Sequence, residues 1–137
     1  MNLGDNISNI MTGNVHSVKP EDELYRAIKL IRKHKIRHLP VVDQGTVVGI
    51  ISSTDLNRLT FGGIFDNQDG TDEAILEMLT IPQVMTSRPR TVLENQSIRE
   101  VAEIFAREGF HALPVVGVDG ELKGIVTTTD IIKLLLG

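Results

Sequence analysis

Two aspartates, Asp55 and Asp130, each follow a hydroxyl side chain by three residues, Ser52 in one case and Thr127 in the other. Each aspartate stands at the predicted start of a helix that follows a strand. A carboxylate at that point can accept charge-assisted hydrogen bonds from both hydroxyls of a ribose, and the free N–H groups of the helix suit a phosphate. The same Ser/Thr-x-x-Asp spacing is that of a capping box, which only satisfies the helix start. The local sequence leaves ribose binding and capping open.

Basic side chains precede a Leu-Pro step in both halves of the chain. Arg37 and His38 occupy these positions in the first half, and His111 followed by Ala112 occupies them in the second. Arginine can hold a phosphate through its planar fork, and histidine can do so once it is protonated. The second copy therefore lacks one of the two basic candidates. The alternative is that these residues are only the solvated basic end of a helix.

The candidate residues occur twice because the chain contains an internal repeat. Pro40 and Pro114 are 74 residues apart, whereas Asp55 and Asp130 are 75 apart, so the second copy carries one extra residue in its turn. A Met-Thr pair recurs at the same interval of 74. Such a repeat predicts two similar units. Either half alone would bury too little surface to be comfortably stable, so we expect the two to share a core.

The periodicity of the first repeat predicts the elements that position these residues. Residues 15–18 alternate as a short strand does, and residues 41–48 predict a hairpin with glycine at its turn. Between them, Pro20 and the acids after it predict the first turn of a helix that ends near residue 34 or 35. A second helix is predicted to begin at Asp55. The apolar face of the first helix is expected to comprise Leu24, Ala27, Ile28 and Ile31.

The second repeat predicts the same order of elements. A strand is expected at Thr91-Val92, a hairpin turn at residues 117–120 and an apolar closing helix over residues 131–136. We expect the closing helix to pack between the repeats or against another subunit. Together with the helix around residues 24–31 it is expected to offer more apolar surface than one small core hides, which predicts a homodimer or larger assembly. The apolar face of the central helix is predicted to comprise Ile98, Val101, Ala102 and Phe105.

A polar segment separates the two repeats. We predict a first motif over residues 1–65, a linker over 66–76 and a second motif over 77–137. The linker resembles a calcium loop with Asp66 in first place, but its glycine, Gly70, is fifth where that loop requires it sixth. A solvated connector is the interpretation we favour. Apolar residues from Ala74 to Leu79 predict a helix that leads into the second motif.

Composition excludes several classes of function. The net charge of −4 speaks against a general nucleic-acid surface, and the absence of cysteine excludes disulfides and thiolate zinc sites. No apolar run approaches a membrane span, and residues 1–5 lack the character of a signal peptide, so we expect a cytoplasmic protein. His34 and His38 have the spacing of two metal ligands on one helix, but that helix is predicted to end before Ile36.

Enzymatic signatures are missing as well. The sequence contains neither a Walker A motif nor Gly-x-Gly-x-x-Gly, and no Gly-x-Ser-x-Gly elbow supports a hydrolase triad. We therefore expect no catalytic residues and no metal.

Each half resembles a CBS motif, the module named for cystathionine beta-synthase, and the pair resembles a Bateman module. The resemblance covers about residues 7–136. It rests on Leu-Pro-Val-Val, on the glycine of the next strand and on Ser/Thr-x-x-Asp, all in order and all present twice. The segment Arg37-His38-Leu39-Pro40 is most similar to the corresponding segment of CBS proteins of the acetoin-utilisation type.

The resemblance implies an α+β fold of two β-α-β-β-α repeats packed about a pseudo-two-fold axis. It also implies two clefts that bind AMP, ADP, ATP or S-adenosylmethionine. Modules of this kind usually form homodimers, report energy or metabolite level to a protein effector, and are not enzymes. The alternative, from another class, is a ligand-free dimerisation module with the same fold.

The resemblance also carries roles to particular residues. It assigns ribose to the two aspartates, phosphate to the basic residues before the Leu-Pro step, and the adenine pocket to the segments after Met-Thr. Plain core packing is an equal alternative for the apolar members. The full set of predicted ligand-binding residues is Thr12, Val15, Ile36, Arg37, His38, Pro40, Ser52, Thr54 and Asp55 in the first repeat, and Thr86, Pro89, Phe110, His111, Pro114, Thr127, Thr129 and Asp130 in the second.

Overall fold

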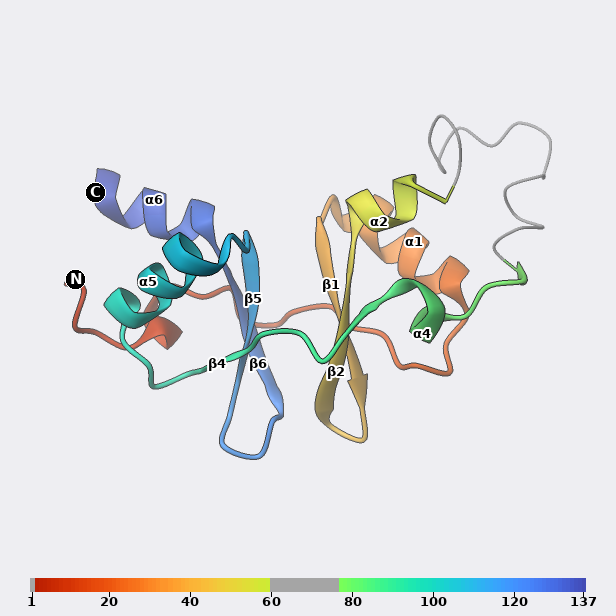
Figure 1. Cartoon of the computed structure of the whole chain (residues 1–137), viewed down its shortest axis with the longest axis horizontal. Coiled ribbons are helices and arrows are strands. Elements are labelled where there is room, and N and C mark those ends of the chain that lie inside the picture. The colour runs from red at the N-terminus through yellow and green to blue at the C-terminus, as the bar shows by residue number, and fades with distance from the viewer. Residues whose placement is uncertain (1, 60–76) are drawn as a thin grey trace. The chain divides into compact units, whose positions relative to one another are not determined.

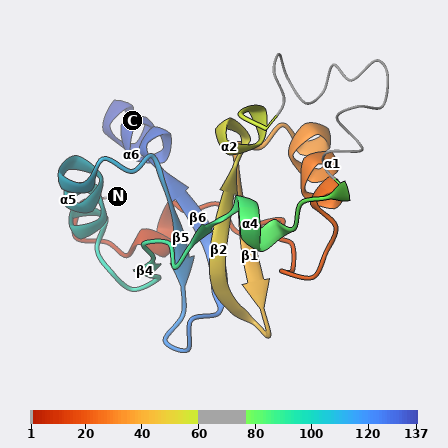
Figure 2. The same ribbon diagram turned by 45° about the vertical axis from the view of Figure 1, so that its right-hand side comes forward.

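A computed structural model describes residues 2–59 and 77–137 and forms two compact units (Figures 1 and 2). Unit 1 comprises Met1–Val15, Gly45–Val47 and Pro89–Gly137, and unit 2 comprises His16–Gln44 and Val48–Arg88. Each unit thus joins most of one repeat to the opening segment of the other. The predicted linker, its calcium-like loop and most of the helix expected from Ala74 lie outside the described residues.

Unit 2 contains a three-stranded sheet in the order β1-β2-β3. Its first two strands form a hairpin, and β3 is a short antiparallel neighbour of β2 contributed by the second repeat. The elements are α1 (Leu24–His34), β1 (His38–Asp43), β2 (Thr46–Ser52), α2 (Ser53–Asn57), α4 (Ile81–Val84) and β3 (Thr86–Ser87).

Unit 1 contains a second three-stranded sheet, in the order β4-β5-β6. Strand β4 runs parallel to β5, and β5 runs antiparallel to β6. The α+β class and the duplicated sheet confirm the predicted fold class. The elements are η1 (Ile7–Asn9), β4 (Val92–Leu93), α5 (Ile98–Glu108), β5 (Ala112–Val116), β6 (Leu122–Thr127) and α6 (Thr128–Leu136).

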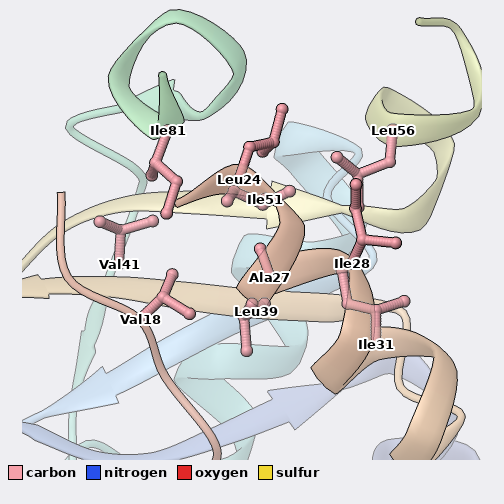
Figure 3. Close-up of a cluster of buried hydrophobic side chains, with 10 residues drawn as sticks. All are labelled: Val18, Leu24, Ala27, Ile28, Ile31, Leu39, Val41, Ile51, Leu56 and Ile81. Carbon is pink, nitrogen blue, oxygen red and sulfur yellow. The ribbon is translucent and has the colours of Figure 1, made fainter. Parts of the chain in front are cut away.

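Helix α1 buries one apolar stripe against the sheet of unit 2 (Figure 3). The predicted face is confirmed, because the side chains at 24, 27, 28 and 31 are all buried, and they meet Leu39, Val41 and Ile51 from the strands. The whole stripe is therefore buried inside unit 2. The prediction that it offers apolar surface to a second subunit is wrong.

The predicted start of α1 at Pro20 is also wrong. The helix begins at Leu24, and its N-cap, Glu23, has extended dihedrals because its backbone forms a bridge with Thr80. Asp22 instead accepts a hydrogen bond of 2.9 Å from the N–H of Lys19, which holds a turn before the helix. The predicted end is confirmed, since Lys35 adopts a left-handed φ of 53° directly after His34.

Helix α5 is the counterpart of α1 in unit 1. Ser97 and Glu100 form a capping box at its start, and Gly109, with φ of 74°, ends it. Its buried stripe contains Ile98, Val101 and Phe105, as predicted. The fourth buried residue is Ile104 and not Ala102, which the sequence pattern had indicated. Both residues flank the same stripe, and the larger side chain fills the core while Ala102 is half-buried.

The two hairpins differ by the extra residue of the second repeat. In the first, Gln44 and Gly45 both have positive φ, 50° and 83°, as a two-residue turn requires. In the second, residues 117–121 form a longer turn, and the register of β5 and β6 shifts between Val115 and Val116. The prediction of one added residue in this turn is confirmed.

The strand predicted at residues 15–18 is nearly absent. Only Val18 pairs, in a single parallel bridge with Val41, because the chain turns at Asn14, with φ of 49°, and reaches the sheet only at Val18. Its counterpart in unit 1 is the two-residue strand β4, which confirms the strand expected at Thr91-Val92 to within one residue. No helix in the described parts of the chain has the length and apolar character to cross a bilayer.

Candidate functional site

The Met-Thr segment of each repeat lies along the second hairpin strand of the other repeat. In unit 2, Thr86 pairs with Ile50. In unit 1, Thr12 exchanges two hydrogen bonds with Ile125, of 2.9 and 3.0 Å. The Met-Thr segments predicted to line the adenine pocket therefore join the sheets that end at the two aspartates.

The glycines of the repeated motif make this approach possible. A Cβ on Gly124 would lie 2.6 Å from the carbonyl oxygen of Thr12, a distance that van der Waals contact forbids. A Cβ on Gly49 would meet the sulfur of Met85. Glycine at position 124 is thus required by the backbone of the segment that crosses the strand, whereas at position 49 only the flexible side chain of Met85 stands in the way.

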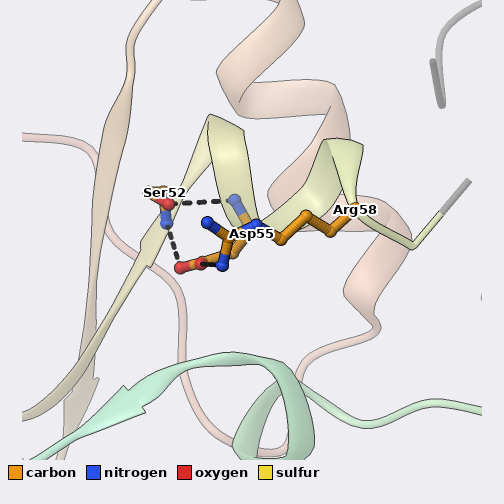
Figure 4. Close-up of polar contacts among 3 residues, drawn as sticks. All are labelled: Ser52, Asp55 and Arg58. Atoms are coloured by element: carbon orange, nitrogen blue, oxygen red, sulfur yellow. Dashed lines mark hydrogen bonds and ion pairs between the residues drawn. The ribbon is translucent and has the colours of Figure 1, made fainter. Parts of the chain in front are cut away.

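Asp55 closes a capping box at the start of α2 (Figure 4). Its N–H donates to Ser52 Oγ at 3.0 Å, and its Oδ2 accepts from the N–H of Ser52 at 3.4 Å. Its other oxygen, Oδ1, lies 3.9 Å from Nη1 of Arg58, a residue that the sequence analysis did not single out. The spacing of three residues along one helix is the signal that could have found it.

Asp130 closes the equivalent box at the start of α6. Its Oδ2 accepts from the N–H of Thr127 at 2.8 Å and from Thr127 Oγ1 at 3.1 Å, and its own N–H donates to Thr127 Oγ1 at 3.2 Å. Within residues 2–59 and 77–137, Oδ1 of Asp130 has neither a hydrogen bond nor an ion pair.

Capping and ligand binding are compatible at these carboxylates. A carboxylate has about four acceptor positions, and the capping box uses only those of Oδ2. Both aspartates are partly exposed, so the remaining positions face a region that a solute can reach. The capping boxes are therefore present in the structure, and by themselves they leave the second oxygen of each carboxylate to other partners. In unit 2 that oxygen already has Arg58 at 3.9 Å.

The residues before the Leu-Pro step are fixed beside the same helix starts. The carbonyl of Arg37 accepts a hydrogen bond of 2.8 Å from the N–H of Ser53, the first residue of α2. The carbonyl of His111 accepts one of 3.0 Å from Thr128, the first residue of α6. Both side chains are exposed. Each unit thus places the backbone of one basic residue at the start of the helix that its aspartate caps.

The remaining predicted residues divide between core and surface. Pro40 and Pro114 are buried within β1 and β5, and Ile36 packs against the core of unit 2. Phe110 is 41% exposed. His38, at the start of β1, is half-buried. Of the others, Thr54 and Thr129 are exposed in the first turns of α2 and α6, and Val15 and Pro89 are half-buried at the ends of the crossing segments.

The predicted residues therefore fall into two groups, one in each unit. Each group contains residues from both repeats. Unit 2 holds Ile36, Arg37, His38, Pro40, Ser52, Thr54, Asp55 and Thr86. Unit 1 holds Thr12, Val15, Pro89, Phe110, His111, Pro114, Thr127, Thr129 and Asp130.

The family model for the CBS domain matches the sequence twice, over residues 7–61 and 81–137. The chain belongs to the CBS-domain family. The resemblance stated from the sequence is confirmed, and the two matches reproduce the repeat found from the prolines and aspartates.

Two relatives carry ligands of known chemistry. The chain is 29% identical to CBSX2, a chloroplastic CBS domain-containing protein of Arabidopsis thaliana, over 98% of its own length and 65% of that protein. The crystal structure of CBSX2 in complex with AMP has a TM-score of 0.79 and 30% identity and covers 97% of each chain. The CBS domain pair of the protein MJ0100, in complex with 5′-methylthioadenosine and S-adenosyl-L-methionine, has a TM-score of 0.76 and 28% identity and covers 96% of each chain.

The chain spans less than two thirds of the first curated relatives, 65% of the Arabidopsis protein and 46% of the next. A protein of the acetoin-utilization type (AcuB) from Vibrio cholerae shares the fold, with a TM-score of 0.75 at 23% identity over 96% of this chain and 90% of that chain.

Proposed function

We propose that this CBS pair is a regulatory module that binds an adenosyl ligand and passes the signal to a protein effector. The supporting observation is the duplication of one arrangement in both units. Each unit offers a carboxylate whose capping box uses one oxygen, a basic residue at the same helix start and a Met-Thr segment along the adjoining strand. The other oxygen of Asp130 has no partner within residues 2–59 and 77–137, whereas that of Asp55 lies 3.9 Å from Nη1 of Arg58. In relatives of the same fold the ligands are AMP and S-adenosyl-L-methionine.

The chemistry of the arrangement assigns a role to each part. Asp55 and Asp130 accept hydrogen bonds from ribose hydroxyls, which are charge-assisted and therefore strong for their size. Arg37 and His111 bind phosphate, with Ser52 and Thr127 beside them. The Met-Thr segments line the adenine. Arginine is cationic and histidine can become so, and one of them lies in each unit, so AMP, ADP or ATP suits these residues better than S-adenosylmethionine, which carries a sulfonium.

The module acts without catalysis in this proposal. The two functional motifs are residues 1–65 and 77–137, joined by 66–76, and each supplies residues to both groups. We place the protein in the cytoplasm, where adenine nucleotides report energy state.

A thermal-shift screen tests the proposal directly. A ligand at a hundred times its dissociation constant stabilises a fold by about 2.7 kcal/mol. We expect AMP, ADP or ATP to raise the melting temperature and guanosine monophosphate to leave it unchanged. If no adenosyl compound raises it, the ligand-free dimerisation module is the better account.

That second candidate has an observation of its own. Helix α6 presents apolar side chains outward, with Ile132, Leu135 and Leu136 being 54, 69 and 82% exposed. Exposed apolar groups gathered on one helix indicate a contact surface. We propose that α6 contributes to a homodimer, with or without ligand.

A further inference from the structure

His16 and His34 stack face to face in unit 2. Their ring centroids lie 3.8 Å apart and their planes differ by 17°. His34 is the last residue of α1, and His16 is the residue at which the chain enters unit 2 after Val15. Both side chains are exposed. The contact thus links the end of α1 to residues 16–18, which we call the entering segment because the chain enters unit 2 there.

The same tie exists in unit 1 with different chemistry. The residues 74 positions further along are Arg90 and Glu108, and they form an ion pair of 3.6 Å. The segments also share their backbone, since Asn14 and Arg88, again 74 apart, have φ of 49° and 50°. One fold position therefore carries opposite charges in one unit and two imidazoles in the other.

The surroundings of the histidine pair make it sensitive to protons. Arg32 and Lys33 lie in the last turn of α1 with His34, and Lys35 follows it. In the described ranges no carboxylate forms an ion pair with either ring. Desolvation, then the charge of His16 and then that of Lys33 lower the pKa of His34 from its ordinary value of 6.5. A second proton on the pair would place like charges face to face.

We propose that the His16–His34 stack is a proton-sensitive latch that holds the entering segment on α1 near neutral pH and releases it in mild acid. The Arg90–Glu108 ion pair is the counterpart of this contact in unit 1 and contains no imidazole. The inference does not depend on the proposed ligand, because it concerns only contacts within unit 2.

The direction of the pH effect follows from linkage. The unfolded chain protonates His34 near its ordinary pKa, and the folded chain does so only at lower pH. Stability from this contact is therefore complete above about pH 6.5 and is lost as the pH falls from there through the folded pKa. Loosening should also appear locally, as faster exchange of the N–H of Val18, which donates to Pro40 at 3.1 Å two residues after His16.

The chain supplies its own control. The double variant His16→Arg/His34→Glu copies the pair of unit 1 into unit 2, and His38 and His111 remain in both proteins. Between about pH 7.5 and about pH 5.5 the parent should lose more of its urea midpoint than the double variant. Glu94, whose N–H donates to Val116 at 3.0 Å in unit 1, serves as the reference for exchange at Val18 after correction for intrinsic rates.

NMR titration of the imidazole signals of His34 tests the latch even if the double variant folds poorly. In His16→Ala, the pKa of His34 should rise toward its ordinary value. An unchanged pKa of His34 in His16→Ala would overturn the latch. So would equal losses of the urea midpoint in the parent and a folded double variant.

Discussion

Ile50 of β2 pairs with Thr86 of β3, although the two residues belong to different repeats. The pairing has a counterpart in the bridge between Thr12 and Ile125. Each sheet is therefore completed by the opening segment of the other repeat. The exchange explains why neither repeat is a compact unit by itself, and it brings Thr86 into the unit that holds Asp55.

The glycines under the crossing segments should be sensitive to the smallest substitution. Gly124→Ala forces a methyl group onto the backbone of Thr12, so we expect it to destabilise the fold by about 1–3 kcal/mol. Gly49→Ala meets only the flexible side chain of Met85 and should cost less. Urea unfolding measures both.

Gly13→Ala is the matched control for these glycines, because nothing lies within 4 Å of a Cβ at that position. It should change the unfolding free energy by no more than about 0.5 kcal/mol. Equal stability of Gly124→Ala and Gly13→Ala would mean that the crossing segment does not press on β6.

The outward face of α6 should set the oligomeric state. We expect the parent to be a dimer in light scattering, and Leu135→Asp, which puts a charge on an apolar contact, to be monomeric. Val118→Asp is the control, since Val118 is 90% exposed on the turn between β5 and β6. A parent that is monomeric with and without nucleotide would contradict the homodimer.

The sequence predicted the structure correctly where a local spacing is compatible with only one kind of element. The buried stripe of α1 and the glycine turn at Gln44-Gly45 are local patterns, and the structure reproduces them. The repeat interval of 74 residues could also be read directly from the sequence. Local patterns were misleading where a segment distant in sequence sets the backbone conformation. Glu23 was expected in a helix, yet its backbone is held extended by Thr80, more than 50 residues away.

The candidate site shows the same division. Ser52 and Asp55 could be paired from their spacing, and the repeat showed that the pairing matters twice. That Arg37 lies at the same helix start depends on the hydrogen bond from Ser53 to its carbonyl, which no local pattern indicates. The partnership of His16 with His34 is equally invisible in the sequence, because a loop and a helix end meet only in the fold.

Phosphate contacts should separate AMP from adenosine. Arg37→Ala and His111→Ala should each weaken AMP binding while leaving adenosine binding unchanged, because only AMP carries a phosphate.

Calorimetric titration of AMP and of adenosine into the parent and both variants measures these effects. A loss that is equal for adenosine and AMP would show that the two residues shape the fold or the pocket instead. No loss for either ligand would show that they are a solvated helix end.

Asp55 and Asp130 also cap helices, so a loss of stability alone cannot show whether they bind ribose. Ser97→Ala is the control, since it breaks the capping box of α5, which has no proposed ligand contact. It should cost about 0.5–2 kcal/mol of stability and leave AMP affinity unchanged.

The most direct measurement is calorimetric titration of AMP into the parent, Asp55→Asn, Asp130→Asn and Ser97→Ala. Loss of charge-assisted hydrogen bonds costs about 1.5–3 kcal/mol, so each asparagine variant should bind roughly ten- to a hundredfold more weakly in one site only. Ser97→Ala should bind as the parent does. If both asparagine variants bind AMP with the affinity of the parent, the aspartates are caps alone and the ribose assignment is wrong.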